Sequence, residues 1–495
     1  MLLLTLPEIK IFDQGGLAAH VAEWQRVTYG ERLSFRPDWR IARLDVLGVR
    51  KLPFITRRNF VYEFVHLLPW SVLAGLVEGQ FAGVVVSKTF HGSSLLIAIA
   101  AAMPYAAYVS SLFWGMLCVG RPKVRLSVLC GAGTALCAGV VGAIPQSDFG
   151  AVWFVAQIAA AQIFLAGVVT VRAAIWKSNY PPAVRGQIAA RLQRIRSVVS
   201  IFAVQAASAF CDQNPSAYRF VYPAAAILGL IGVALLTRVR IRRERAELRA
   251  PAADEAGDPR SGMVEPFSMT ALLSPGHAFG QMWRVLRDDR RFARYCVAQS
   301  LHGAANLMTI AIIVEVISRD LALGEQWGFW ISTGLITALP VLSLLGSLER
   351  WGAMFDSLGV LRFRVVNVMC WTVSLALGLA GTTLTTAGAA GDPTYFVAAV
   401  AMFGLRGVVN GVAQGGGALA WNLGHLHFAT AANAEVYMGV HVFLAGVRGL
   451  IAPLGGMWLW TVIGEWVWLI AIVMALGSLS IYSELAKDGE NAPRI

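Results

Sequence analysis

Apolar runs of about 20 residues recur along most of this 495-residue chain, and a helix of ~20 apolar residues spans the hydrocarbon core of a bilayer. Hydrophobic residues make up 57% of the sequence and charged residues only 14%, compared with roughly 25% charged residues in ordinary soluble domains. We therefore predict an all-α integral membrane protein that lies mostly within the lipid bilayer.

The apolar runs predict twelve spanning helices in two sets of six. The first set lies near residues 60–88, 91–117, 125–145, 149–176, 183–211 and 217–237, and the second near 292–318, 326–350, 362–385, 394–423, 434–460 and 463–484. The chain then divides into an N-terminal tail (1–57), a six-helix bundle (58–238), a central linker (239–290), a second six-helix bundle (291–485) and a C-terminal tail (486–495). The linker is charged and rich in Pro and Ala, which is typical of disorder. Its last residues, around Trp283 and Arg284, predict a short helix on the membrane surface.

Lysine and arginine residues are concentrated on one side of the predicted membrane. That side receives the tails, the linker and the segments 121–125, 177–191 and 350–364, whereas the other side receives little beyond Lys88, Arg219 and Arg319. Because basic segments stay in the cytoplasm, we predict a multi-pass protein of the cytoplasmic membrane with both termini inside. The same rule accounts for the net charge of +12 without nucleic-acid binding.

The sequence lacks the common motifs of catalytic and cofactor sites. Metalloprotease, serine-hydrolase and nucleotide-binding-loop patterns are absent, and the cysteines and histidines do not have the spacing of metal ligands. We therefore expect no enzyme activity, no cofactor and no metal.

The two sets of helices resemble each other at a spacing of 236 to 237 residues, which grows to 252 toward the end of each set. The matched pairs are His66 and His302, Pro104 and Pro340, Trp114 and Trp351, and Arg196 and Arg448. Insertions in the loop after the fourth helix of the second set would produce the drift. The ordered series predicts that a six-helix unit is duplicated.

The segment between the predicted eighth and ninth helices carries a specific pattern. Gly352, Asp356 and Gly359 are followed by Arg362, and this order resembles the G-x-x-x-D-x-x-G loop, followed by basic residues, of the major facilitator superfamily. Two six-helix halves joined by a central linker are also similar to that family. The equivalent loop of the first half departs from the pattern, because Val119 stands where the acid is expected.

The resemblance implies a secondary active transporter in which two halves rock about a central site and expose it to each side of the membrane in turn. It also implies a cytoplasmic gate in which the loop aspartate pairs with basic residues of neighbouring helices. Asp356 would pair with Arg196 when the cytoplasmic side is closed, and Arg448 holds the matching position in the second half. The alternative is that both arginines extend to lipid headgroups.

Polar side chains lie deep in the apolar stretch of residues 395–427. Arg406, Asn410 and Gln414 follow at four-residue steps and therefore share one helix face. Because an arginine at the centre of the bilayer costs ~2.5–3.5 kcal/mol, we predict that this face points into a protein interior or a water-filled cavity. The flanking glycines, at a spacing that lets helices approach closely, are Gly404, Gly407, Gly411 and Gly415.

Glu78 and Gln162 are the corresponding polar residues near the midplane of the first half. The resemblance implies that helices one, four, seven and ten line the central cavity, so these two residues and Arg406 are candidates for one site. Glu78 is a candidate proton carrier, with Arg406 as its partner or as the group that receives an anionic solute. The alternative is an ion pair that serves only stability.

The predicted seventh helix carries a polar stripe in which His302 and Asn306 are further candidates for lining the cavity. Such stripes also arise from hydrogen bonds between packed helices. At the outer end of this helix, Glu315 and Arg319 are one turn apart and are interpreted as a surface ion pair.

Together these features predict a monomeric secondary active transporter that moves a small solute across the cytoplasmic membrane. An anionic solute and coupling to protons are the finer expectations. The incomplete first loop motif and the long N-terminal tail keep a second hypothesis open, in which the protein is a sensor or assembly scaffold that resembles a transporter but moves no solute.

Overall fold

The computed structural model describes residues 52–118, 121–241, 275–321, 328–388, 393–428 and 434–490. The predicted tail up to residue 51, residues 242–274 of the linker, Val119 and the last five residues lie outside this part. The described residues form helices and no β-strand, as predicted.

The first half comprises α2 (Phe54–Glu78), α3 (Phe81–Lys88), α4 (Ser94–Val109), α5 (Ser111–Cys118), α6 (Lys123–Val140), α7 (Asp148–Asn179), α8 (Pro182–Gln213) and α9 (Tyr218–Leu236). The second half comprises α12 (Pro275–Asp288), α13 (Arg290–Glu315), α14 (Gly328–Thr333), α15 (Leu339–Ala387), α16 (Pro393–Leu423), α17 (Ala434–Ile463) and α18 (Trp466–Glu490). Single π-helical turns, Val316–Asp320 and Gly334–Ala338, follow α13 and α14.

Ten helices in the described part are long and apolar enough to cross a membrane. The longest runs from Gly328 to Ala387 and has 60 residues, far more than the ~20 that a bilayer needs. Two helices meet within it at Gly359, whose φ of 68° lies in the left-handed region that favours glycine. The loop predicted around this residue is therefore helical on both sides and turns at one position.

Two predicted spans are interrupted. The span 60–88 consists of α2 and α3, because Gly79 adopts an extended backbone (φ −83°, ψ −179°) that ends α2. The span 91–117 consists of α4 and α5, which meet at Ser110.

The same pairs of helices pack together in both halves. Helix α2 packs on α8 and α9, as α13 packs on α17 and α18, and α6 packs on α7 and α9, as α15 packs on α16 and α18. One hydrogen bond is also repeated: the Trp114 indole donates to the Ile163 carbonyl at 2.9 Å, and the Trp351 indole donates to the Val412 carbonyl at 2.7 Å. The structure thus repeats one pattern of helix packing in both halves, as the spacing of the matched residues predicts.

The predicted glycine face of α16 packs against the π-helical turn after α14 and the first residues of α15. A Cβ at Gly407 would lie 3.1 Å from the Leu335 carbonyl oxygen, and one at Gly411 would overlap the Pro340 carbonyl. Close approach of the two helices therefore depends on these glycines.

The short helix predicted before the seventh span is α12. Met282, Val285 and Leu286 pack against the second half, whereas Trp283 is exposed. One side of this helix is thus covered by the protein itself.

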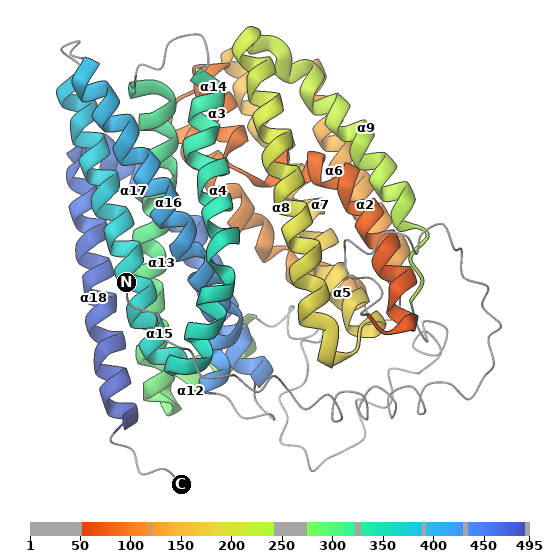
Figure 1. Cartoon of the computed structure of the whole chain (residues 1–495), viewed down its shortest axis with the longest axis vertical. Helices are drawn as coiled ribbons and strands as arrows, with labels where there is room; N and C mark the ends of the chain where they lie inside the picture. The colour runs from red at the N-terminus through yellow and green to blue at the C-terminus, as the bar shows by residue number, and fades with distance from the viewer. Residues whose placement is uncertain are drawn as a thin grey trace, which may run out of the picture.

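The two halves contact each other mainly through α4 on α17 and through α8 on α14. Helices α3 and α14 lie at one end of the molecule, and α5 and α12 lie at the opposite end (Figure 1). The polar contacts between the halves are concentrated at the α3/α14 end, as described below.

Candidate functional site

An ion pair between Glu78 and Arg196 joins α2 to α8 among apolar helices. The Glu78 side chain is 32% exposed and the Arg196 side chain 12%. One residue before Glu78, the Val77 carbonyl accepts a hydrogen bond from Gln162 of α7 at 2.9 Å. The structure therefore brings together Glu78 and Gln162, two residues singled out from the sequence, and adds Arg196 to them.

These contacts bear on two predicted pairings. Glu78 pairs with Arg196, so the alternative in which Arg406 is its ion-pair partner is not the one that is formed. The pair of Asp356 with Arg196 belongs to a closed cytoplasmic side and stays a prediction. Asp356 is exposed on α15. The predicted pairs were based on the depth of each side chain in the membrane. Which residues pair depends also on the side of the helix on which each side chain lies.

Arg406 is buried, with 7% of its surface exposed. Its guanidinium lies 5.8 Å from the centre of the Trp468 ring of α18, and its Nε is buried without a hydrogen-bond partner. Further along α16, Gln414 donates to Asn410 at 2.5 Å. The arginine thus faces the interior of the second half, away from lipid, as predicted.

The polar stripe on α13 lies within the second half as well. Asn306 and His302 are in hydrogen-bond contact at 3.3 Å, and Gln299 contacts His441 of α17 at 3.4 Å. Arg448 of α17 donates to the backbone carbonyl of Gln299 at 2.9 Å. These contacts tie α13 to α17, which matches the helix-packing alternative for the stripe.

The predicted gate residues are spread over the α5/α12 end. Arg362 and Asp356 are exposed on α15, Gly359 forms the turn between its two arms, and the space beside Gly352 is open. Their role as a gate stays a prediction.

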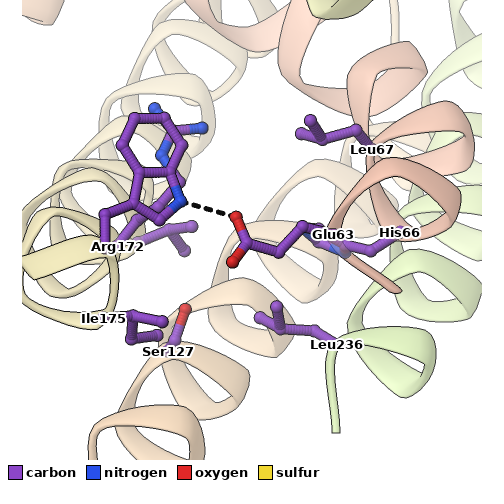
Figure 2. A pocket seen from close by; sticks show the side chains of 9 residues that line it. Glu63, His66, Leu67, Ser127, Arg172, Ile175 and Leu236 are labelled. Carbon is purple, nitrogen blue, oxygen red and sulfur yellow. Dashed lines mark hydrogen bonds between the residues drawn. The ribbon is translucent and has the colours of Figure 1, made fainter. Parts of the chain in front are cut away.

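A buried carboxylate, Glu63 of α2, was not predicted. It accepts hydrogen bonds from the Tyr180 hydroxyl at 2.7 Å and from the Trp176 indole at 2.5 Å. Figure 2 shows the indole bond and Arg172 beside the same tryptophan ring, over which its guanidinium lies at 5.1 Å. The cluster borders a cavity of about 20 Å³, room for about one water molecule. One sequence signal could have drawn attention to Glu63: it is three residues before His66, so the two side chains lie one turn apart on the same helix.

Replacing Glu63 with alanine should destabilise the protein, because both donors would lose a charged acceptor and each such bond contributes ~1.5–3 kcal/mol. Tyr180→Phe removes one of the two bonds and should have about half the effect. Thermal unfolding in detergent measures both variants. Equal melting temperatures for Glu63→Ala and the native protein would show that the cluster does not stabilise the fold.

Glu315 and Arg319 form the predicted ion pair at 2.6 Å, but it is not a surface pair. The Glu315 side chain is only 6% exposed, because it also accepts from Ser94 of the first half at 2.8 Å. Arg319 in turn donates to the Gly92 carbonyl. The pair therefore joins the two halves.

Further contacts between the halves lie at the same end. Asp212 of α8 accepts from the backbone N–H groups of Phe329 and Trp330, at the start of α14, at 2.7 and 2.9 Å. Ser318 also contacts Ser87 and Thr333 contacts Ser208, both at 2.8 Å. We call these contacts, together with those of Glu315 and Arg319, the polar seam. The seam joins the two halves at the α3/α14 end.

Within the described ranges, no group of three or more His, Cys, Asp or Glu side chains could hold a metal ion.

Comparisons with known proteins bear on the fold. No protein-family model matches the chain, and no curated protein matches it either. Three solved structures are similar over most of their length. The nucleoside transporter NupG has a TM-score of 0.58 at 13% identity, covering 89% of this chain and 100% of that one. The peptide transporter POT in complex with sulfate has a TM-score of 0.62 at 13% identity, covering 87% and 95%. The xylose transporter XylE from E. coli, in a partially occluded inward open conformation, has a TM-score of 0.55 at 11% identity, covering 86% and 97%.

All three are transporters of the major facilitator superfamily fold, and identities of this size bear on the fold alone. The chain is thus a multi-pass membrane protein with the fold of the major facilitator superfamily transporters.

Proposed function

We propose that this protein is a secondary active transporter that moves a small solute across the cytoplasmic membrane by alternating access. The observation that carries the proposal is the Glu78–Arg196 ion pair, which is partly exposed although apolar helices surround it. Charged groups at such depth are expensive to insert and commonly mark a solute or ion pathway. The fold, shared with nucleoside, peptide and xylose transporters, supports the same function.

The proposal includes twelve spans. The 60-residue apolar stretch contributes two, on either side of Gly359, and α4 with α5 contributes one more. The basic segments around α5 and α12 support a cytoplasmic location of that end. The polar seam would then lie on the outer side.

The finer part of the proposal is an anionic solute coupled to protons. The second half contains the buried cation Arg406, and no described ion pair joins it to a carboxylate. An anionic group on the solute would offset this charge. Glu78 is the candidate proton carrier, because protonation would release Arg196 and loosen the contact between α2 and α8.

The test is flux into proteoliposomes that contain the purified full chain. Radiolabelled nucleosides, dipeptides, sugars and organic anions are offered with and without an inward proton gradient. Saturable uptake of at least one solute class is expected. If no solute moves, while a partner protein remains bound through purification, the scaffold hypothesis is correct instead.

Glu78→Gln should abolish the part of uptake that a proton gradient drives, because the amide cannot carry the proton. Solute exchange without a gradient should persist. Glu349→Gln is the matched control, since Glu349 forms an exposed ion pair with Arg194 of α8 and its loss changes the charge equally. Uptake that is still accelerated by a proton gradient in Glu78→Gln would rule out this residue as the carrier.

A further inference from the structure

The matched arginines of the two halves have different surroundings. Arg196 of α8 is neutralised by the Glu78 carboxylate. Among the described residues, Arg448 of α17 donates only to the backbone carbonyl of Gln299, at 2.9 Å. Its Nε is buried without a hydrogen-bond partner. The same position of the repeat therefore carries a paired cation in the first half and an unpaired one in the second.

A second acid of the first half is also missing from the second. Glu63 and Gln299 are 236 residues apart, the same spacing as His66 and His302, so they occupy matching positions. Glu63 is a carboxylate with two donors, whereas the Gln299 amide is uncharged and its Oε1 is buried without a partner. The second half thus has an amide where the first half has an acid; this amide contacts His441 at 3.4 Å, and the backbone carbonyl of the same residue accepts from Arg448.

No nearby described group compensates for this loss. Arg448 is half-buried, and the buried cation in its neighbourhood, Arg364, donates to the Tyr295 hydroxyl at 3.1 and 3.3 Å. Among the described residues, no ion pair joins Arg364 or Arg448 to a carboxylate. A half-buried cation without a counter-charge is partly desolvated at a cost, so an anion that reaches it would be bound favourably.

Arg448 lies where the two halves meet. Its guanidinium rests on Gly303 of α13, where any Cβ would overlap it. The next residue, Gly449, packs against Tyr105 of α4 from the first half, so closely that a Cβ there would lie 2.6 Å from the Tyr105 Cβ. One turn further along α4, Tyr108 is exposed and lies within electrostatic range of Glu78 and Arg196. Arg448 and the Glu78–Arg196 pair therefore flank the same stretch of α4.

We propose that Arg448 binds an oxyanion, a carboxylate, phosphate or sulfate group of the transported solute, which supplies the negative charge that the second half lacks. The inference rests on the proposed transport function and assigns the anionic group to Arg448 and not to Arg406. A guanidinium suits this task because its planar set of donors matches two oxygens of one oxyanion.

The test measures thermal unfolding of the full-length protein in phosphatidylcholine nanodiscs with sodium sulfate, phosphate or succinate, each compared with sodium chloride at equal ionic strength. At least one oxyanion should raise the melting temperature in a dose-dependent way. Arg448→Gln should weaken the apparent affinity by about tenfold or more, a loss of ~1.4 kcal/mol or more. Arg194→Gln, an exposed arginine of α8, should leave the affinity unchanged.

Gln299→Glu gives the sharper result, because it restores the acid of the first half while Arg448 remains. It should abolish the oxyanion effect and raise the melting temperature without anions. Glu78→Gln acts in the opposite direction, since it leaves Arg196 unpaired and should strengthen the oxyanion effect. If Gln299→Glu responds to oxyanions like the native protein, Arg448 is not the binding group.

A parallel set in nanodiscs with phosphatidylglycerol separates a solute from a lipid headgroup. Stabilisation by this lipid in the native protein and not in Arg448→Gln, with no effect of soluble oxyanions, would assign Arg448 to headgroups and overturn the proposal. Flux of neutral solutes that is unaffected by Arg448→Gln, without any oxyanion binding, would refute this inference and leave transport standing. Absence of all flux would instead refute transport.

Discussion

Gly411→Val should prevent the second half from folding into a stable structure. A Cβ at this position would overlap the backbone carbonyl of Pro340, and a carbonyl within a helix cannot rotate aside as a side chain can. Extra methyl groups in a packed core typically cost ~1–3 kcal/mol, and here α16 would have to move away from the helix it packs on. We expect a cost at or above the top of that range.

The measurement is the yield of monodisperse protein in size-exclusion chromatography, followed by thermal unfolding of what is recovered. Gly404→Ala is the control on the same helix, because its Cβ would meet only Leu335 Cδ2, at 3.8 Å, an ordinary contact. Native yield and melting temperature for Gly411→Val would show that α16 does not need this close approach.

Asp212→Ala should open the α3/α14 end of the molecule. Its carboxylate accepts two backbone N–H groups of α14 across the boundary between the halves. Because each hydrogen bond to a charged group contributes ~1.5–3 kcal/mol and ~1.4 kcal/mol is a tenfold change in an equilibrium, the ratio of closed to open molecules should fall by at least about tenfold.

Pulsed electron paramagnetic resonance between spin labels at Phe220 and Trp466 reports this change. Both positions are exposed and begin helices of different halves, α9 and α18. The labels are attached in a background where the six cysteines are replaced. Asp148→Ala is the control, since Asp148 is exposed in the first turn of α7. An unchanged distance distribution in Asp212→Ala would mean that the capping of α14 does not hold this end closed.

Periodicity predicted the parts of the fold that depend on one helix or on the repeat. The glycine face of α16 and the matching tryptophans, Trp114 and Trp351, follow from spacing in the sequence alone, and the structure shows them packed and hydrogen-bonded in equivalent ways. The position of Arg406 away from lipid could also be predicted, because exposing a guanidinium to lipid is costly whichever helices surround it.

Partner choice could not be predicted in the same way. Position along a helix gives the depth of a side chain in the membrane, but not the neighbour it faces, so Arg406 was a candidate partner of Glu78 although Arg196 is the residue that pairs with it. The Glu63 cluster was missed because Tyr180 follows the predicted end of the fourth span. The contacts of Glu315 depend on how the halves are docked, which no local pattern encodes.

The composition of the polar seam has a consequence for turnover. It consists of separate hydrogen bonds of modest strength: the neutral bonds of Ser318 with Ser87 and of Thr333 with Ser208 contribute ~0.5–1.5 kcal/mol each, and those accepted by Glu315 and Asp212 contribute ~1.5–3 kcal/mol each. Several weak bonds can break one after another, each within thermal reach, whereas a single strong bond imposes one high barrier. A boundary of this kind suits the proposed transport cycle, in which the two halves separate and re-associate at this end in every turnover.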